Sequence, residues 1–174
     1  MAEFDPPHFQ ELGLAGALVW LKDRMQQHDL GVTLQLESES VILPHYQVVL
    51  LYKSIRELLM NVVKHAGVKT AAISMRMRAG QTLEITVKDQ GIGFRLPKDN
   101  SAKPGDHFGL RSVGQRIQDL GGQLHIESAI GKGCTVTFTL PLRHTEADRA
   151  AETVPRDRVI TMPHDPHQQT LPLP

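Results

Sequence analysis

The chain has 174 residues, and its 19 lysines and arginines balance its 19 aspartates and glutamates, so the formal net charge is zero. This length is typical of one domain with one hydrophobic core, and the absence of a net positive charge argues against a general binder of nucleic acids or anionic membranes. A single cysteine excludes an internal disulfide framework, and no apolar run is long enough to span a membrane. No signal peptide is recognisable, so the expected compartment is a reducing cytoplasm.

The first third of the chain predicts a helix, a strand and a longer helix. Apolar residues recur on one helical face between residues 14 and 25, and this helix is expected to end near residue 30. Residues 32–36 alternate apolar and polar side chains, which is typical of a half-buried strand. An apolar-rich stretch from about Pro44 to Ala66 predicts the second helix, with proline near its first turn and Gly67 after its end.

The rest of the chain predicts mainly strands. Residues 91–107 lack periodicity and form an unusually long loop, and residues 110–120 predict a third helix. Residues 143–174 contain five prolines and no apolar periodicity, so we expect a domain over residues 1–142 followed by a disordered tail or linker. Four segments alternate apolar and polar residues and are predicted strands, the first two as an antiparallel hairpin: 73–77, 83–87, 123–128 and 135–142.

The long helix carries polar side chains on one part of an otherwise apolar surface. At about 100° per residue, Glu57, Asn61 and Lys64 fall within about 60° of one another, and His65 lies beside them. A solvated helix face with stabilising polar pairs is the ordinary interpretation of such a pattern. The alternative is a polar site built on this helix, and two further segments favour it.

The first of these segments follows the strand over residues 83–87. Asp89 continues the phase of its apolar residues and therefore points to the core side, where an unpaired carboxylate is costly. Capping of the turn that follows is one explanation, and a ligand that donates hydrogen bonds is the other. Gly91 and Gly93 favour a ligand, because glycine allows the backbone to approach it closely. The second segment begins at Phe108 and places Gly109 at the start of a helix, where free N–H groups bind phosphate.

Together these segments resemble the ATP-binding domain of sensor histidine kinases, within the GHKL superfamily. The resemblance covers about residues 5–142 and is closest to the nitrate-sensor and DegS-like subfamily. The matching motifs, in chain order, are the N box at residues 57–66, the first glycine box at 89–94, the second at 109–110, and the last at 131–135.

The resemblance implies an α/β two-layer sandwich, the Bergerat fold, with a mixed, mostly antiparallel sheet packed on helices and an ATP lid between Phe94 and Phe108. It implies ATP and Mg²⁺ as cofactors. Glu57 would help to activate the phosphoryl acceptor, and Asn61 would bind the metal. The remaining implied nucleotide-binding residues are Lys64 and His65 at the phosphates or ribose, Asp89 at the adenine amino group, Gly91 and Gly93 at the base and sugar, and Gly109 and Leu110 at the phosphates. Phe108, at the end of the lid, is expected to fold towards the pocket. Cys134 stands where threonine is usual, so a hydroxyl contact near the base either comes from Thr135 or is lost.

The implied reaction transfers the ATP γ-phosphoryl group to a histidine on a phosphoacceptor and dimerisation domain that this chain lacks, for relay to a response regulator. The chain is therefore expected not to phosphorylate itself, to contact no nucleic acid, and to reach a membrane only through absent upstream segments. One alternative is another GHKL ATPase or serine kinase. The other is a non-catalytic module in which nucleotide gates a protein interface.

Overall fold

The computed structural model describes residues 9–37, 41–79, 81–95 and 108–142, and side chains from residue 12 onwards, except that of Phe108. The lid expected between Phe94 and Phe108 lies almost wholly outside the described residues, as does the expected tail over residues 143–174.

One five-stranded sheet carries the fold, and its strand order is β1-β2-β3-β5-β4. β1 pairs parallel with β2, and the other three pairings are antiparallel. The predicted hairpin is present, and the mixed, mostly antiparallel sheet is confirmed. The strands are β1 (Gly31–Leu36), β2 (Thr70–Arg78), β3 (Thr82–Asp89), β4 (Gln123–Ser128) and β5 (Cys134–Pro141).

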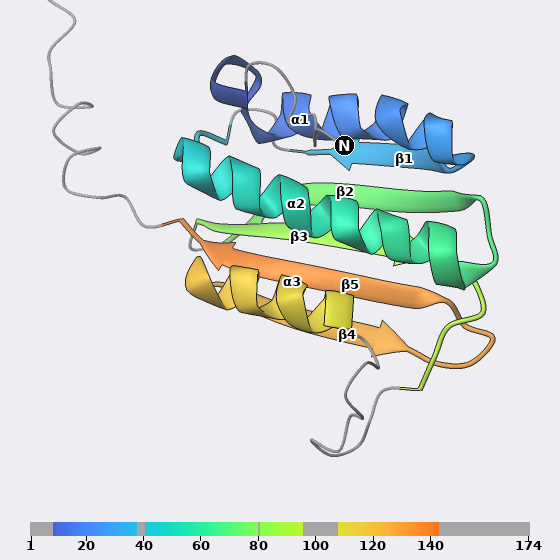
Figure 1. Cartoon of the computed structure of the whole chain (residues 1–174). Coiled ribbons are helices and arrows are strands. Elements are labelled where there is room, and N and C mark those ends of the chain that lie inside the picture. Colours follow the sequence, from blue (N-terminus) through green and yellow to red (C-terminus); the bar gives the residue numbers. More distant parts are fainter. Residues whose placement is uncertain (1–8, 38–40, 80, 96–107, 143–174) are drawn as a thin grey trace, which may run out of the picture. The chain divides into compact units, whose positions relative to one another are not determined.

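Helices cover one face of this sheet, which makes a two-layer α/β sandwich (Figure 1). α1 spans Phe9–Met25, α2 spans His45–Asn61 and α3 spans Phe108–Asp119. Leucines and isoleucines from α1 and α2 are buried against the inner face of the sheet, as the helical periodicity predicts. α2 and α3 lie side by side and antiparallel, because the C-terminal half of α2 meets the first turn of α3 (Figure 1).

Two helix ends differ from the prediction. α1 ends at Met25 and continues as a short 3₁₀ turn, η1 (Gln26–His28), rather than as regular helix to residue 30. α2 is followed by a π-helical turn, η2 (Val62–Ala66), before Gly67 leaves the helix with φ of 69°. A π turn is wider than an α turn, so the angular step of about 100° per residue in an α-helix does not give the directions of Lys64 and His65. Such turns are frequent at functional sites. The apolar periodicity of the sequence does not reveal them, because one extra residue in a turn changes the pattern too little.

The phase of β5 decides which of its residues can face the helices. Val136, Phe138 and Leu140 are buried on the inner face, while the Oγ1 atoms of Thr86 and Thr137 are 3.2 Å apart on the outer face. Because side chains alternate along a strand, position 134 points inward and position 135 outward. This phase places a thiol, and not a hydroxyl, on the side of the helices.

Two neighbouring substitutions test the phase of β5. Phe138→Ala removes one of the largest fully buried side chains and should lower the free energy of unfolding by about 3–5 kcal/mol. Thr139→Ala, one residue along on the outer face, should cost less than about 1 kcal/mol. Urea denaturation followed by circular dichroism measures both. Equal losses, or a larger loss for Thr139→Ala, would contradict this register.

Candidate nucleotide-binding site

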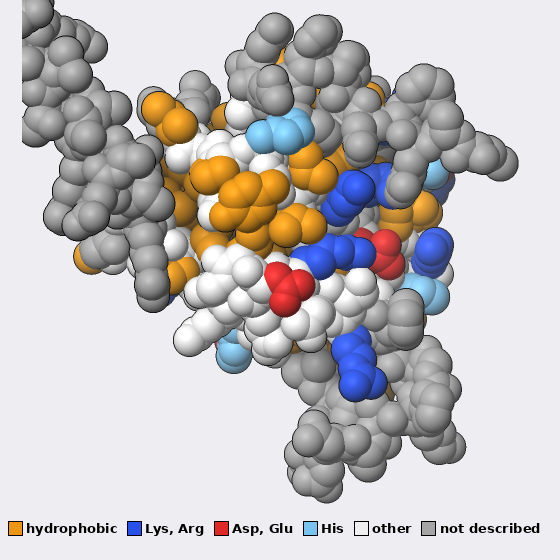
Figure 2. Space-filling model, turned by 60° about the vertical axis from the view of Figure 1, so that its left-hand side comes forward, with side chains coloured by type: hydrophobic (Ala, Val, Ile, Leu, Met, Phe, Trp, Pro, Cys, Tyr) orange, Lys and Arg blue, Asp and Glu red, His pale blue; other side chains and the backbone are white. Residues whose placement is uncertain are grey.

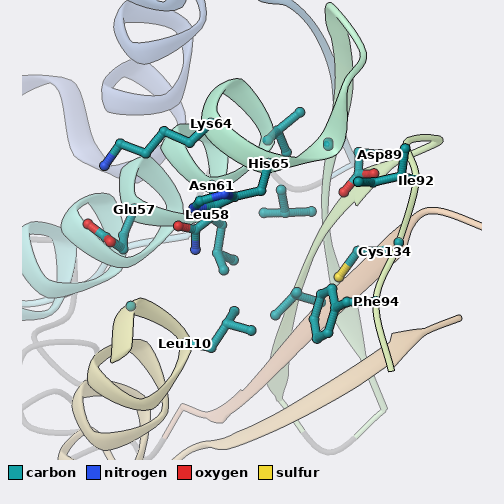
Figure 3. A pocket seen from close by; sticks show the side chains of 16 residues that line it. Glu57, Leu58, Asn61, Lys64, His65, Asp89, Ile92, Phe94, Leu110 and Cys134 are labelled. Atoms are coloured by element: carbon teal, nitrogen blue, oxygen red, sulfur yellow. The ribbon is translucent and has the colours of Figure 1, made fainter. Parts of the chain in front are cut away.

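A cavity of about 620 Å³ opens between the end of α2, the inner face of the sheet and the start of α3. Its middle is apolar, formed by side chains such as Leu58, Val87 and Val136. Polar groups stand at two separate ends: Glu57 and Asn61 on one side, and Asp89 on the other (Figure 3). The site residues expected from the sequence that line it are Glu57, Asn61, Lys64, His65, Asp89, Gly93, Gly109 and Leu110.

Gly109 brings the start of α3 against the polar side chains of α2. A Cβ atom at residue 109 would lie 2.8 Å from Oε1 of Glu57 and 3.4 Å from Nδ2 of Asn61. Only glycine therefore lets the backbone approach this closely without displacing Glu57. The first N–H groups of a helix have no intrahelical partner and carry partial positive charge, so this end of the cavity suits an anion.

Asn61 is suited to hold a metal ion that a ligand brings with it. Within the described part of the chain, no group of three or more histidine, cysteine, aspartate or glutamate side chains converges to form a metal centre. The half-buried Asn61 amide has no side-chain hydrogen-bond partner among those residues, so its oxygen is available in the cavity. One neutral oxygen ligand fits Mg²⁺, which usually takes few protein ligands and completes its shell with phosphates and water.

Asp89 combines both roles that its sequence position allowed. Its side chain is 8% exposed, and its Oδ1 accepts a hydrogen bond of 2.8 Å from the backbone N–H of Gly91. The carboxylate therefore caps the turn, yet it also lines the cavity (Figure 3). Its second oxygen has no partner among the described residues, so it remains an acceptor for a ligand's N–H group.

Gly91 and Gly93 shape the backbone beside Asp89 in different ways. Gly91 does not line the cavity, because it packs behind it: a Cβ there would lie 2.2 Å from the carbonyl oxygen of Ala66. Gly93 lines the cavity with φ of 61°, and a Cβ there would meet the carbonyl oxygen of Ala129 at 2.1 Å. Both glycines permit close packing, but only Gly93 is placed to meet a ligand.

The expectation for Thr135 needs correction. Thr135 lies opposite Lys88 in the ladder between β3 and β5, on the outer face of the sheet, and it does not line the cavity. Cys134 lies opposite Asp89 and takes the inward position. The hydroxyl expected from Thr135 is therefore not supplied by this strand. The side chain of Phe108, another expected contact, lies outside the described residues.

Cys134 is neutral in this environment. Its burial, and to a lesser degree the nearby carboxylate of Asp89, raise the pKa of the thiol from 9.0 to about 11, although a hydrogen bond with Ser128 acts in the opposite direction. A neutral thiol is only a weak hydrogen-bond donor. Its sulfur lies next to Phe94 at the Asp89 side of the cavity (Figure 3).

Ser128 is a structural contributor that the sequence analysis missed. Its hydroxyl donates to the carbonyl oxygen of Gly133 at 2.9 Å and accepts from the backbone N–H of Phe94 at 2.9 Å. The side chain thereby joins the end of β4 to the turn before β5 and to the segment that follows Asp89 in the chain. A serine at the end of a strand carries no distinct signal in the sequence, because its partners are remote along the chain.

Lys64 and His65 are exposed at the mouth of the cavity, on the π turn η2. They bring the ammonium group of Lys64 and the imidazole ring of His65 to this end of the cavity (Figure 3).

A separate apolar surface lies at the other end of α2, where Ile42 is 94% and Tyr46 59% exposed. Figure 2 brings that side forward and shows hydrophobic side chains gathered on it. This surface is not part of the cavity.

The chain is similar to a known protein family and to several sensor proteins. Residues 47–144 match the family described as histidine kinase-, DNA gyrase B- and HSP90-like ATPase. The chain is 33% identical over 135 residues to a sensor protein NarQ homolog from Haemophilus influenzae, which covers 76% of this chain and 23% of that protein. It is 36% identical over 92 residues to the sensor histidine kinase YdfH from Bacillus subtilis, covering 53% of this chain and 22% of that protein. The chain thus spans less than a quarter of these relatives.

Solved structures show the same fold. The histidine kinase domain of a blue-light activated histidine kinase from Erythrobacter litoralis superposes with a TM-score of 0.60 at 22% identity, covering 79% of this chain and 63% of that one. The histidine kinase AdeS from Acinetobacter baumannii superposes with a TM-score of 0.59 at 20% identity, and the match covers 78% of this chain and 66% of that one. The two-layer sandwich expected from the sequence is confirmed.

The raised pKa of Cys134 predicts slow alkylation of the folded chain. At pH 8 the thiolate fraction should be about 100-fold lower than for an unperturbed thiol, and the greater nucleophilicity of a more basic thiolate restores about tenfold. Iodoacetamide should therefore react about tenfold more slowly in buffer than in urea, as measured by mass spectrometry of the single cysteine. The pKa of the Cys134 thiol is higher in the folded chain, about 11, than its ordinary value of 9.0. The unfolded chain therefore loses this proton first, and the free energy of unfolding should fall as the pH rises from 9 to 11. Equal alkylation rates in both solvents would contradict this environment.

Proposed function

The chain belongs to the histidine kinase-, DNA gyrase B- and HSP90-like ATPase family, and on that premise we propose that it is the catalytic, ATP-binding part of a sensor histidine kinase. One observation carries the proposal: a single cavity has Asp89 at one end and Glu57 with Asn61 at the other, with apolar walls between them. That order suits adenine, a sugar and a triphosphate.

Adenine would bind at the Asp89 end. The free carboxylate oxygen accepts a hydrogen bond from the exocyclic amino group, and apolar side chains such as Leu58 and Val136 contact the faces or edges of the base. The triphosphate would then extend towards Gly109. There it meets the N–H groups at the start of α3 and the ammonium group of Lys64.

Phosphoryl transfer would take place beside Glu57. An imidazole nitrogen of the acceptor histidine attacks the γ-phosphorus, the bond to the β,γ-bridging oxygen breaks, and ADP leaves. Glu57 accepts a hydrogen bond from the N–H group on the other side of that imidazole, which orients the ring and stabilises its developing positive charge. Asn61 would hold Mg²⁺, which neutralises phosphate charge. Catalysis of this kind depends on positioning and charge neutralisation.

The acceptor histidine would come from a phosphoacceptor and dimerisation domain outside this chain, and a response regulator would take the phosphoryl group next. The proposed compartment is the cytoplasm. None of the described helices is long and apolar enough to cross a bilayer.

Labelling with γ-³²P ATP tests the proposed reaction. The chain alone should bind ATP without labelling itself, and it should label a separately supplied phosphoacceptor domain of the same kinase. Glu57→Gln should lower that labelling by about 10²–10⁴-fold while ATP still binds. Glu127→Gln, whose side chain is 72% exposed on β4, is the matched control and should behave as wild type. ATP binding with no labelling of the acceptor would favour a nucleotide-gated module instead.

Asp89→Asn tests the orientation of the nucleotide. The substitution keeps the size of the side chain but removes the charge-assisted hydrogen bond, so the free energy of ATP binding should weaken by roughly 1.5–3 kcal/mol. Titration calorimetry measures this loss, and circular dichroism verifies the fold. Asp119→Asn is the control, because Asp119 is exposed and its carboxylate accepts a hydrogen bond from the side chain of Gln115, away from the cavity. Unchanged ATP affinity in a folded Asp89→Asn variant would overturn the assignment of this end to adenine.

A further inference from the structure

Two buried polar atoms on facing helices have no hydrogen-bond partner within the described part of the chain. One is Oγ of Ser54 on α2, and the other is Nη1 of Arg116 on α3. Ser54 is 0% exposed, and Arg116 is half-buried. Buried polar atoms of native proteins are nearly always paired, and an unpaired guanidinium nitrogen is especially costly. A pairing that satisfies both atoms is therefore strongly favoured.

Helix geometry places these two residues opposite each other. Asn61 and Gly109 face each other across the pair, since a Cβ at residue 109 would lie 3.4 Å from Nδ2 of Asn61. Ser54 precedes Asn61 by seven residues, and Arg116 follows Gly109 by seven. Seven residues make about two turns, return to the same helix face and advance by about 10 Å. Because α2 and α3 are antiparallel, both steps run in the same direction along the pair (Figure 1).

Apolar side chains cover one side of both residues. Leu51, Ile55 and Leu58 are buried beside Ser54 on α2, and Val113 and Ile117 are buried beside Arg116 on α3. Apolar contacts of this kind are not directional and tolerate small rotations of one helix against another. The hydrogen bonds of a planar guanidinium group have a defined geometry, so they favour one arrangement of the helices.

We propose that one water molecule bridges Nη1 of Arg116 and Oγ of Ser54, accepting a hydrogen bond from the guanidinium group and donating one to the hydroxyl, and that this bridge holds α3 in place against α2. Arg116 and Ser54 are then positioning residues. They act through the backbone of α3 on Gly109 and Leu110, about two helical turns away, where the triphosphate would bind. The inference rests on the proposed binding of ATP, and it adds a determinant of affinity that lies outside the cavity.

The test compares ATP with adenosine, which lacks the phosphates. Arg116→Met keeps much of the length of the side chain but removes its donors, and it should weaken binding of Mg-ATP about tenfold while adenosine affinity changes less than about twofold. Ser54→Ala should weaken Mg-ATP in the same selective way. The double variant should lose no more than Arg116→Met alone, because both substitutions remove one contact. Gln118→Met, on the exposed face of α3, is the control and should bind both ligands as wild type.

Three results in these variants would contradict the proposed contact. Additive losses in the double variant, equal losses of ATP and adenosine, or unchanged ATP affinity in folded variants would each overturn the proposal. If Arg116→Met does not fold, Ser54→Ala and Arg116→Lys, which keeps the charge but lacks the planar donors, decide by the same two affinities. A wild-type chain that binds no ATP would overturn the proposed function and, with it, the positioning role. Wild-type binding combined with insensitive variants would overturn the Ser54–Arg116 contact alone.

Discussion

Helix α2 packs an apolar stripe against the inner face of the sheet while an adjacent stripe of the same helix faces α3, and the rest of the site depends on this double contact. Leu51, Ile55 and Leu59 are fully buried and determine which face of the helix turns towards the sheet. With that face buried, Glu57 and Asn61 lie on the face that lines the cavity (Figure 3). The polar face of α2 that lines the cavity is therefore held by the packing of the core.

The two ends of the cavity use opposite physical means. At the α3 end, backbone N–H groups and the exposed ammonium group of Lys64 supply positive potential without burying a cation, which avoids a desolvation penalty. At the β3 end, a carboxylate that is 8% exposed is tolerated because the N–H of Gly91 satisfies one of its oxygens. A ligand with an N–H donor at one end and phosphates at the other complements both. The apolar walls between them favour a flat ring.

The neutral thiol of Cys134 reduces the number of strong hydrogen-bonding groups at the Asp89 end of the cavity. A hydroxyl at that position would add a strong donor and acceptor near the carboxylate, whereas a thiol with a pKa of about 11 offers only a weak donor. Hydrogen bonding at this end therefore depends mainly on Asp89 and the neighbouring backbone. Ser128 supports that backbone by joining Phe94 to Gly133. The polar recognition of a base would thus rest on fewer side chains of β5 than the sequence resemblance implies.

Local periodicity in the sequence determined most of the elements, the inward direction of Asp89 and the shared face of Glu57 and Asn61, because alternation along strands and helices is a property of neighbouring residues. Three features required the tertiary structure. The π turn at Lys64 and His65, the pairing that puts Cys134 and not Thr135 beside Asp89, and the approach of Gly109 to Glu57 all depend on segments that meet only after folding. The facing pair of Ser54 and Arg116 is of the same kind, since no local pattern records which helices become neighbours or in which direction they run.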